Sequence, residues 1–126
     1  MAVVSDLKEM LREISEAFPH FLVGETSEQS KDTIRSWVVD VKYDGGDVLL
    51  MVPQDKAQNR NNAMSVHDVY RSFVALSAED HDSVELCPVE NSVFRFDIGI
   101  VGAHVAEEES ALVFWGHDAN KQDAAS

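Results

Sequence analysis

The sequence predicts an α+β fold in which an antiparallel sheet of about five to six strands carries two helices on one face. Apolar residues recur with helical spacing in two segments, and they alternate with polar residues in several others. Hydrophobic residues make up 44% of the 126 residues, which is enough for one core. We expect the order α-βββ-α-ββ with a further C-terminal strand, forming a single domain over residues 1–120, and a flexible tail over residues 121–126.

The first helix is expected from about Ser5 to Phe18. Ser5 is a suitable N-cap, and Asp6 suits the first turn because carboxylates are favourable at a helix N-terminus. Pro19 ends the helix, since the residue before a proline is pushed out of the helical region. The apolar face of this helix comprises Leu7, Met10, Leu11, Ile14 and Phe18.

Three strands are expected to follow the first helix. Residues 20–24 suit a short strand, and residues 36–43 alternate between apolar and polar side chains, as a half-buried strand does. The glycines within residues 44–47 favour a hairpin turn. Residues 48–52 are all apolar, which predicts a strand buried on both faces, and Pro53 ends it.

A polar loop is expected over residues 54–63, and loops of this length often carry function. A second helix is predicted from about Ser65 to Ser77, because Ser65 and Asp68 have the spacing of a capping box. Its apolar stripe comprises Val66, Val69, Tyr70, Phe73 and Val74.

The C-terminal half is expected to add a hairpin formed by residues 84–89 and 93–101. Residues 107–116 fit two structures: three glutamates followed later by a glycine suit a short helix, whereas the run Leu-Val-Phe-Trp favours a strand. We favour the strand. Cys87 is the single cysteine and is expected to be a small buried hydrophobe, so no internal disulfide can form.

The acidic residues are distributed unevenly along the chain. The formal charge is −13; residues 1–63 hold 11 acids and 7 bases, whereas residues 64–126 hold 12 acids and 3 bases. Such a field repels nucleic acid and anionic membranes and attracts basic partners. Residues 1–6 hold no basic residue, and no run of about 18 apolar residues occurs, so we expect neither a secretory leader nor a membrane anchor. We therefore expect a cytoplasmic protein that binds neither nucleic acid nor membrane directly.

Two surfaces are candidates for binding a basic protein. The first is an acidic face in the second half of the chain, and the second is the polar loop. The acidic face comprises Glu79, Asp80, Asp82, Glu107, Glu108 and Glu109, and the loop contributes Lys56, Asn59, Arg60 and Asn61.

Three of the five histidines precede an aspartate, which raises the question of a metal site. Neighbouring residues on a helix point about 100° apart, so such a pair does not readily share one metal. No nucleophile motif and no phosphate-binding glycine loop occurs. We expect no cofactor and no catalytic residue; if there were a metal site, its candidates would be His81, Asp82, His104 and His117.

Three classes of function remain. The first is a non-catalytic acidic module that neutralises or escorts a basic protein, as an inhibitor, an immunity or phage anti-defence protein, or a small secretion chaperone. The expected order of elements resembles that of type III secretion chaperones, which are also small and acidic; the likeness is one of topology and charge. The second class is a viral or phage assembly subunit that forms homo-oligomers. The third is a small His/Asp metal-dependent enzyme.

Overall fold

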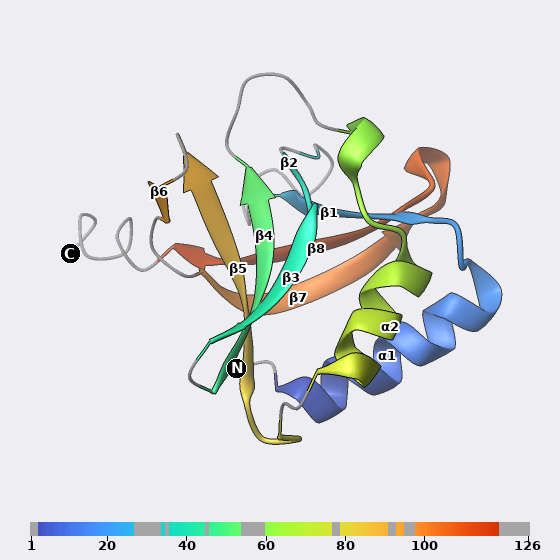
Figure 1. Cartoon of the computed structure of the whole chain (residues 1–126). Coiled ribbons are helices and arrows are strands. Elements are labelled where there is room, and N and C mark those ends of the chain that lie inside the picture. Colours follow the sequence, from blue (N-terminus) through green and yellow to red (C-terminus); the bar gives the residue numbers. More distant parts are fainter. Residues whose placement is uncertain are drawn as a thin grey trace.

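In the described part of the chain, each of two helices is followed by a run of strands, and both helices lie on one side of the sheet (Figure 1). This segregation confirms the predicted α+β fold class. The computed structural model describes residues 3–26, 34, 36–44, 46–53, 60–76, 79–90, 93–94 and 98–118. The predicted tail at residues 121–126 lies outside this part of the chain. The elements are α1 (Val4–Ala17), β1 (Leu22–Thr26), β2 (Ser36–Trp37), β3 (Asp40–Asp44), β4 (Asp47–Pro53), the 3₁₀ turn η1 (Arg60–Asn62), α2 (Val66–Ala75), β5 (Ser83–Glu90), β6 (Val93–Phe94), β7 (Ile98–Ala106), the 3₁₀ turn η2 (Glu107–Glu109) and β8 (Ala111–Asp118).

The described strands form one mixed sheet in the order β2-β1-β8-β7-β5-β4-β3, with β6 paired to β5. The sheet differs from the wholly antiparallel one predicted, because β1 pairs with β8, and β4 with β5, in parallel. Parallel neighbours need a long connection, and α2 lies in the connection between β4 and β5. The pattern of residues within each strand carries no information on this pairing, which depends on where the chain returns.

The sheet closes on itself at one point. Its two outermost strands, β2 and β3, are halves of one chain segment that are separated only by Val38 and Val39. The N–H of Val38 donates to Val23 O of β1 at 2.9 Å, and the N–H of Val39 donates to Met51 O of β4 at 3.0 Å. Consecutive residues therefore join the two ends of the sheet, and the strands wrap around a common interior as in a small barrel.

Beyond this junction β1 and β3 separate, and the opening is filled by other parts of the chain. Met64 accepts a hydrogen bond from the N–H of Val23 and donates one to Val38 O, at 2.9 and 2.8 Å. The helices α1 and α2 cover the open side, as Figure 1 shows. Their apolar faces complete the core; its buried members are Val4, Leu7, Leu11, Val23, Val38, Val48, Leu50, Val52, Val66, Val69, Phe73, Val84, Leu86, Ile100, Leu112 and Phe114.

Helix α1 begins at Val4, so the prediction of Ser5 as its cap is wrong. The N-cap is Val3, whose side chain makes no capping bond. Two backbone carbonyls take that role: Val4 N–H donates to Asp82 O at 2.9 Å, and Ser5 N–H donates to Asp80 O at 3.1 Å. These bonds satisfy N–H groups that a helix leaves open at its start.

Helix α2 begins as predicted, because Ser65 Oγ accepts a hydrogen bond from the N–H of Asp68 at 3.1 Å. Val69 and Phe73 are buried, but Val74 is 54% exposed and does not belong to the buried stripe. The helix ends at Ala75. Within the described part of the chain, no helix has the length and apolar character needed to cross a membrane.

Strand β4 confirms the prediction of burial on both faces. Leu50 and its alternate neighbours point into the main core, whereas Leu49 and Met51 form a second cluster with Cys87 on the opposite face. Cys87 is buried, as predicted for a small hydrophobe. The turn before β4 is also confirmed, since Gly46 has a φ of 96°, a conformation that glycine adopts without strain.

Candidate binding site

The turn between β7 and β8 presents three consecutive glutamates. Residues Glu107–Glu109 form the 3₁₀ turn η2, and Ser110 follows in the left-handed region, with φ 52° and ψ 49°. The N–H of Ser110 donates to Glu107 O at 3.1 Å, and Ser110 O accepts from Leu22 N–H of β1 at 3.0 Å. The preference for a strand in the ambiguous segment is confirmed from Ala111 onward. The hydrogen bond between Leu22 and Ser110 therefore links the C-terminal end of the turn to β1.

A depression of about 290 Å³ lies beside this turn. Ile34, Ala106 and Val113 give it an apolar lining, and His104 of β7 contributes an imidazole. The three glutamates complete its lining. The alternation of side chains along β7 and β8 explains this arrangement, because residues two positions apart point to the same face of a strand.

An aromatic pair extends the surface next to the depression. The rings of His104 and Trp115 are 5.5 Å apart between centroids and are inclined by 48°. Trp115 lies against Gly102, where a Cβ atom would come within 2.2 Å of the indole. Glycine at position 102 therefore allows the indole to lie close to the sheet beside His104.

The carboxylates of this site are available to a ligand. Glu107, Glu108 and Glu109 are all exposed. Among the residues that the structure describes, no base forms an ion pair with them. Their charges are therefore not cancelled locally by a described neighbour, and a cation near the depression meets an apolar wall and several carboxylates together.

The second group of predicted acidic residues lies elsewhere. In Figure 1 the turn of residues 79–82 is at the lower end of the molecule, whereas η2 is at the upper right. The two groups are therefore not one continuous acidic face, although they belong to the same half of the sequence. Glu79 and Asp80 are exposed, whereas Asp82 is 8% exposed.

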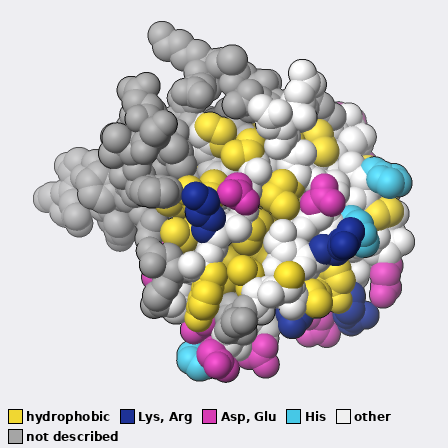
Figure 2. Space-filling model, in the orientation of Figure 1, with side chains coloured by type: hydrophobic (Ala, Val, Ile, Leu, Met, Phe, Trp, Pro, Cys, Tyr) yellow, Lys and Arg dark blue, Asp and Glu magenta, His cyan; other side chains and the backbone are white. Residues whose placement is uncertain are grey.

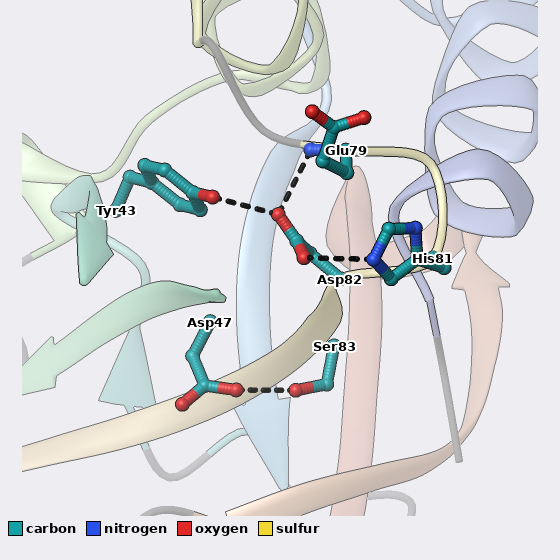
Figure 3. Close-up of polar contacts among 6 residues, drawn as sticks. All are labelled: Tyr43, Asp47, Glu79, His81, Asp82 and Ser83. Carbon is teal, nitrogen blue, oxygen red and sulfur yellow. Dashed lines mark hydrogen bonds and ion pairs between the residues drawn. The ribbon is translucent and has the colours of Figure 1, made fainter. Parts of the chain in front are cut away.

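The carboxylate of Asp82 accepts hydrogen bonds from other parts of the fold, so it is not an exposed charge on the surface (Figure 3). Its Oδ2 accepts hydrogen bonds from Tyr43 Oη and from the N–H of Glu79, both at 2.8 Å. Nearby, Ser83 Oγ donates to Asp47 Oδ1 at 2.5 Å. Because α1 begins on the carbonyls of this same turn, these contacts connect the β3–β4 hairpin, the start of β5 and the start of α1.

The Tyr43–Asp82 hydrogen bond shifts the pKa values of both side chains. The hydrogen bond from Tyr43, followed by that from the Glu79 N–H, lowers the pKa of Asp82 below its ordinary value. The same bond is the main reason that the pKa of Tyr43 is raised, with desolvation and the charges of Asp82, Glu79 and Asp47 adding to it. The bond therefore favours a charged Asp82 and a neutral Tyr43.

Replacing Tyr43 by phenylalanine is expected to narrow the pH range over which the protein is stable. The contribution of the bond is complete between the usual pKa values of aspartate and tyrosine, about 4 and about 10. It is lost as the pH falls through the lowered pKa of Asp82, and again as the pH rises through the raised pKa of Tyr43. Melting temperature measured against pH should therefore fall most in the variant at neutral pH and converge with the parent at both extremes. Tyr70→Phe is the control, and two profiles that stay parallel would contradict the role of the bond.

The predicted loop surface is described only in part. Lys56 and Asn59 lie outside the described residues. Arg60 and Asn61 lie in η1, so the end of the expected loop is a 3₁₀ turn, and Asn61 is exposed. The loop thus remains a prediction as a binding surface.

The four metal candidates are not brought together. His81 Nε2 lies 3.8 Å from Asp82 Oδ1 in the turn before β5, whereas His104 lines the depression beside η2. His117 lies on β8, opposite Gly99. Among the described residues, no group of three or more His, Cys, Asp or Glu side chains is arranged to hold a metal ion. Nothing in the described residues positively indicates an enzyme.

Comparison of the chain with models of protein families, with curated proteins and with solved structures found no match. The resemblance of the element order to type III secretion chaperones thus gains no support from similar proteins.

Sequence reasoning named the three glutamates and His104 but missed the residues that make the site concave. Ala111, Val113 and Trp115 alternate along β8, which places them on the face opposite Leu112 and Phe114. That periodicity could have placed Val113 and Trp115 on one surface. The arrival of Ile34 from a distant part of the chain has no such signal.

Proposed function

We propose that this chain is a non-catalytic acidic module that binds a basic protein through the depression beside η2. The observation that carries the proposal is the joint presence of an apolar lining and three exposed glutamates around one depression of about 290 Å³. A lysine or arginine side chain has matching parts: its methylene stem packs on apolar surface while its charged group reaches carboxylates. The site needs no cofactor.

The charge of the whole molecule supports the same class of partner. At −13 the chain attracts cations over a distance of about one Debye length and repels nucleic acid and anionic membranes. Such a field raises the rate of encounter with a basic protein, while the depression supplies the short-range contacts. A module of this kind either neutralises its partner, as an inhibitor, immunity or anti-defence protein does, or escorts it as a small chaperone. A cytoplasmic location suits these roles and is part of the proposal.

Neutralising the three glutamates should weaken binding of a basic ligand about tenfold. The probe is a hexa-arginine peptide, titrated against the parent and against a variant carrying Glu107→Gln, Glu108→Gln and Glu109→Gln. Affinity of the parent should fall as salt is raised, because screening weakens exposed charges. Calorimetry or fluorescence anisotropy gives the dissociation constants.

A second triple variant separates the site from the bulk charge. Glu9→Gln, Glu13→Gln and Glu79→Gln remove the same number of negative charges from exposed positions outside the depression. This control should keep the affinity within about twofold of the parent. Equal losses of affinity in the two triple variants would show that the peptide responds to the net charge of the protein and does not bind in the depression.

A further inference from the structure

The lining of the depression beside η2 includes an aromatic ring, and this ring bears on which basic side chain fits there. His104 is half-buried and lines the depression together with Ala106 and Val113. An aliphatic wall accepts the methylene stem of lysine or arginine alike. The face of an aromatic ring also attracts a cation, and it suits a planar guanidinium group better than a compact ammonium group.

The strand register places the imidazole close to the glutamates. His104 pairs with Val113 of β8, and Ala106 pairs with Ala111, so β7 runs from the ring directly into η2. His104 and Ala106 are two positions apart, so their side chains lie on the same face of the strand. The ring and the carboxylates line one depression of about 290 Å³, which brings both within reach of a single bound side chain.

Trp115 limits the movement of the imidazole. The centroids of the two rings are 5.5 Å apart, and their planes are inclined by 48°. Trp115 in turn lies against Gly102, which precedes His104 by two positions on the same strand. Because this contact already restricts the imidazole, little side-chain freedom remains to be lost when a ligand stacks on it.

The glutamates provide a second difference between arginine and lysine. In a 3₁₀ turn three residues complete one revolution, so Glu107, Glu108 and Glu109 leave the backbone in three different directions. A guanidinium group carries five N–H donors in one plane and can bond carboxylates on two of its sides. An ammonium group is a smaller and more strongly hydrated charge. Carboxylates that approach from different directions therefore favour arginine.

The face of the molecule that carries α2 and β3 presents a different arrangement of charge. Figure 2 shows lysine and arginine side chains among acidic ones on that face, in the orientation of Figure 1. Of the described residues that line the depression, by contrast, none is a lysine or an arginine. The depression is therefore the more favourable of the two surfaces for a cationic side chain.

We propose that the depression selects arginine over lysine, and that His104 is the residue that determines this selectivity. The inference rests on the proposed function, because it names the side chain that the acidic module receives. The guanidinium group stacks on the imidazole and donates hydrogen bonds to the carboxylates of η2. The methylene stem of the same arginine packs against Ala106 and Val113.

Titration with hexa-arginine and with hexa-lysine measures the selectivity. The two peptides carry the same charge, so the net charge of the protein attracts them equally. The titrations are made at pH 8, at which a free imidazole is neutral. The parent should bind hexa-arginine about fivefold more tightly than hexa-lysine. Equal affinities overturn the selectivity and leave the proposed function in place, whereas failure of both peptides to bind overturns the proposed function as well.

Two substitutions of His104 separate the ring from the other contacts. His104→Leu keeps an apolar side chain but removes the aromatic face, so the preference for hexa-arginine should fall below about twofold while hexa-lysine binding stays within about twofold of the parent. His104→Phe keeps an aromatic face and should keep the preference near fivefold. Circular dichroism shows whether each variant is folded. A full preference in the leucine variant, or its loss in a folded phenylalanine variant, overturns the role of His104.

His81→Leu is the matched control, because it makes the same chemical change outside the depression. The His81 side chain is 84% exposed in the turn before β5. This variant should keep both the affinities and the preference of the parent. If it lowers the preference as much as His104→Leu does, the selectivity does not arise in the depression and the inference is wrong.

Discussion

Replacing Val38 by proline should lower the free energy of unfolding by about 2–5 kcal/mol. Val38 is fully buried, and its N–H bonds Val23 O of β1 where the sheet closes. Proline has no N–H, so a buried carbonyl loses its donor, which costs about 1–3 kcal/mol. The changed side chain also packs less well in the core, at a further cost of about 1–2 kcal/mol. Urea denaturation followed by circular dichroism measures the total.

Val41→Pro is the matched control in the same segment. Its N–H points toward the open edge of β3 and meets the Asp40 side chain, so no bond of the sheet is lost. Its valine is half-buried rather than fully buried. This variant should cost about 1–2 kcal/mol. If Val38→Pro cost no more than Val41→Pro, the closure at Val38 and Val39 would contribute nothing to stability.

Adding a methyl group at Gly102 should destabilise the protein by about 2–3 kcal/mol. The new Cβ would lie 2.2 Å from Trp115 Cζ2, 2.4 Å from Cε2 and 2.8 Å from Nε1. No carbon atom approaches an indole so closely, so the ring has to move, and with it the contact to His104. Chemical denaturation measures the loss of stability for Gly102→Ala, and near-ultraviolet circular dichroism measures the displacement of the indole.

A double-mutant cycle shows whether the indole is the cause. Trp115→Ala removes the ring, so the methyl group of Gly102→Ala then has room. The double variant should be more stable than the sum of the two single losses implies, by at least about 1 kcal/mol. Strict additivity would mean that the cost of the methyl group arises from the backbone at Gly102 and not from Trp115.

The parts of the fold that sequence reasoning predicted are those determined by neighbouring residues. The spacing of Leu7 and Leu11 identified the buried face of α1, and Ser65 with Asp68 identified the start of α2. The parallel pairs depend on where distant segments return, which no local pattern records. Residues 36–43 alternate except at Val38, where an apolar residue takes a polar position. That departure alone does not show that the segment changes its partner from β1 to β4 at Val38 and Val39.

The candidate site was predicted only in part, because it too depends on contacts between segments that are distant in the sequence. Charge alone identified Glu107–Glu109, but it also grouped them with Asp82, which the fold buries beneath Tyr43, a residue 39 positions earlier in the chain. Composition shows how many carboxylates a segment holds. It does not show which carboxylate accepts a hydrogen bond from a hydroxyl group far away in the sequence, because that depends on the three-dimensional fold.

The parallel pairing of β1 with β8 has a consequence for synthesis of the chain. Leu22 pairs with Ala111, about 90 residues later, and β8 lies between β1 and β7 in the sheet. On the ribosome, β1 can pair with β2 early, but its parallel neighbour β8 is missing until residues 111–118 have emerged. Contacts over such separations make folding slow and leave strand edges open to other chains in the meantime. A nascent chain that ends before Ala111 should remain sensitive to protease and should gain resistance only when β8 has left the exit tunnel.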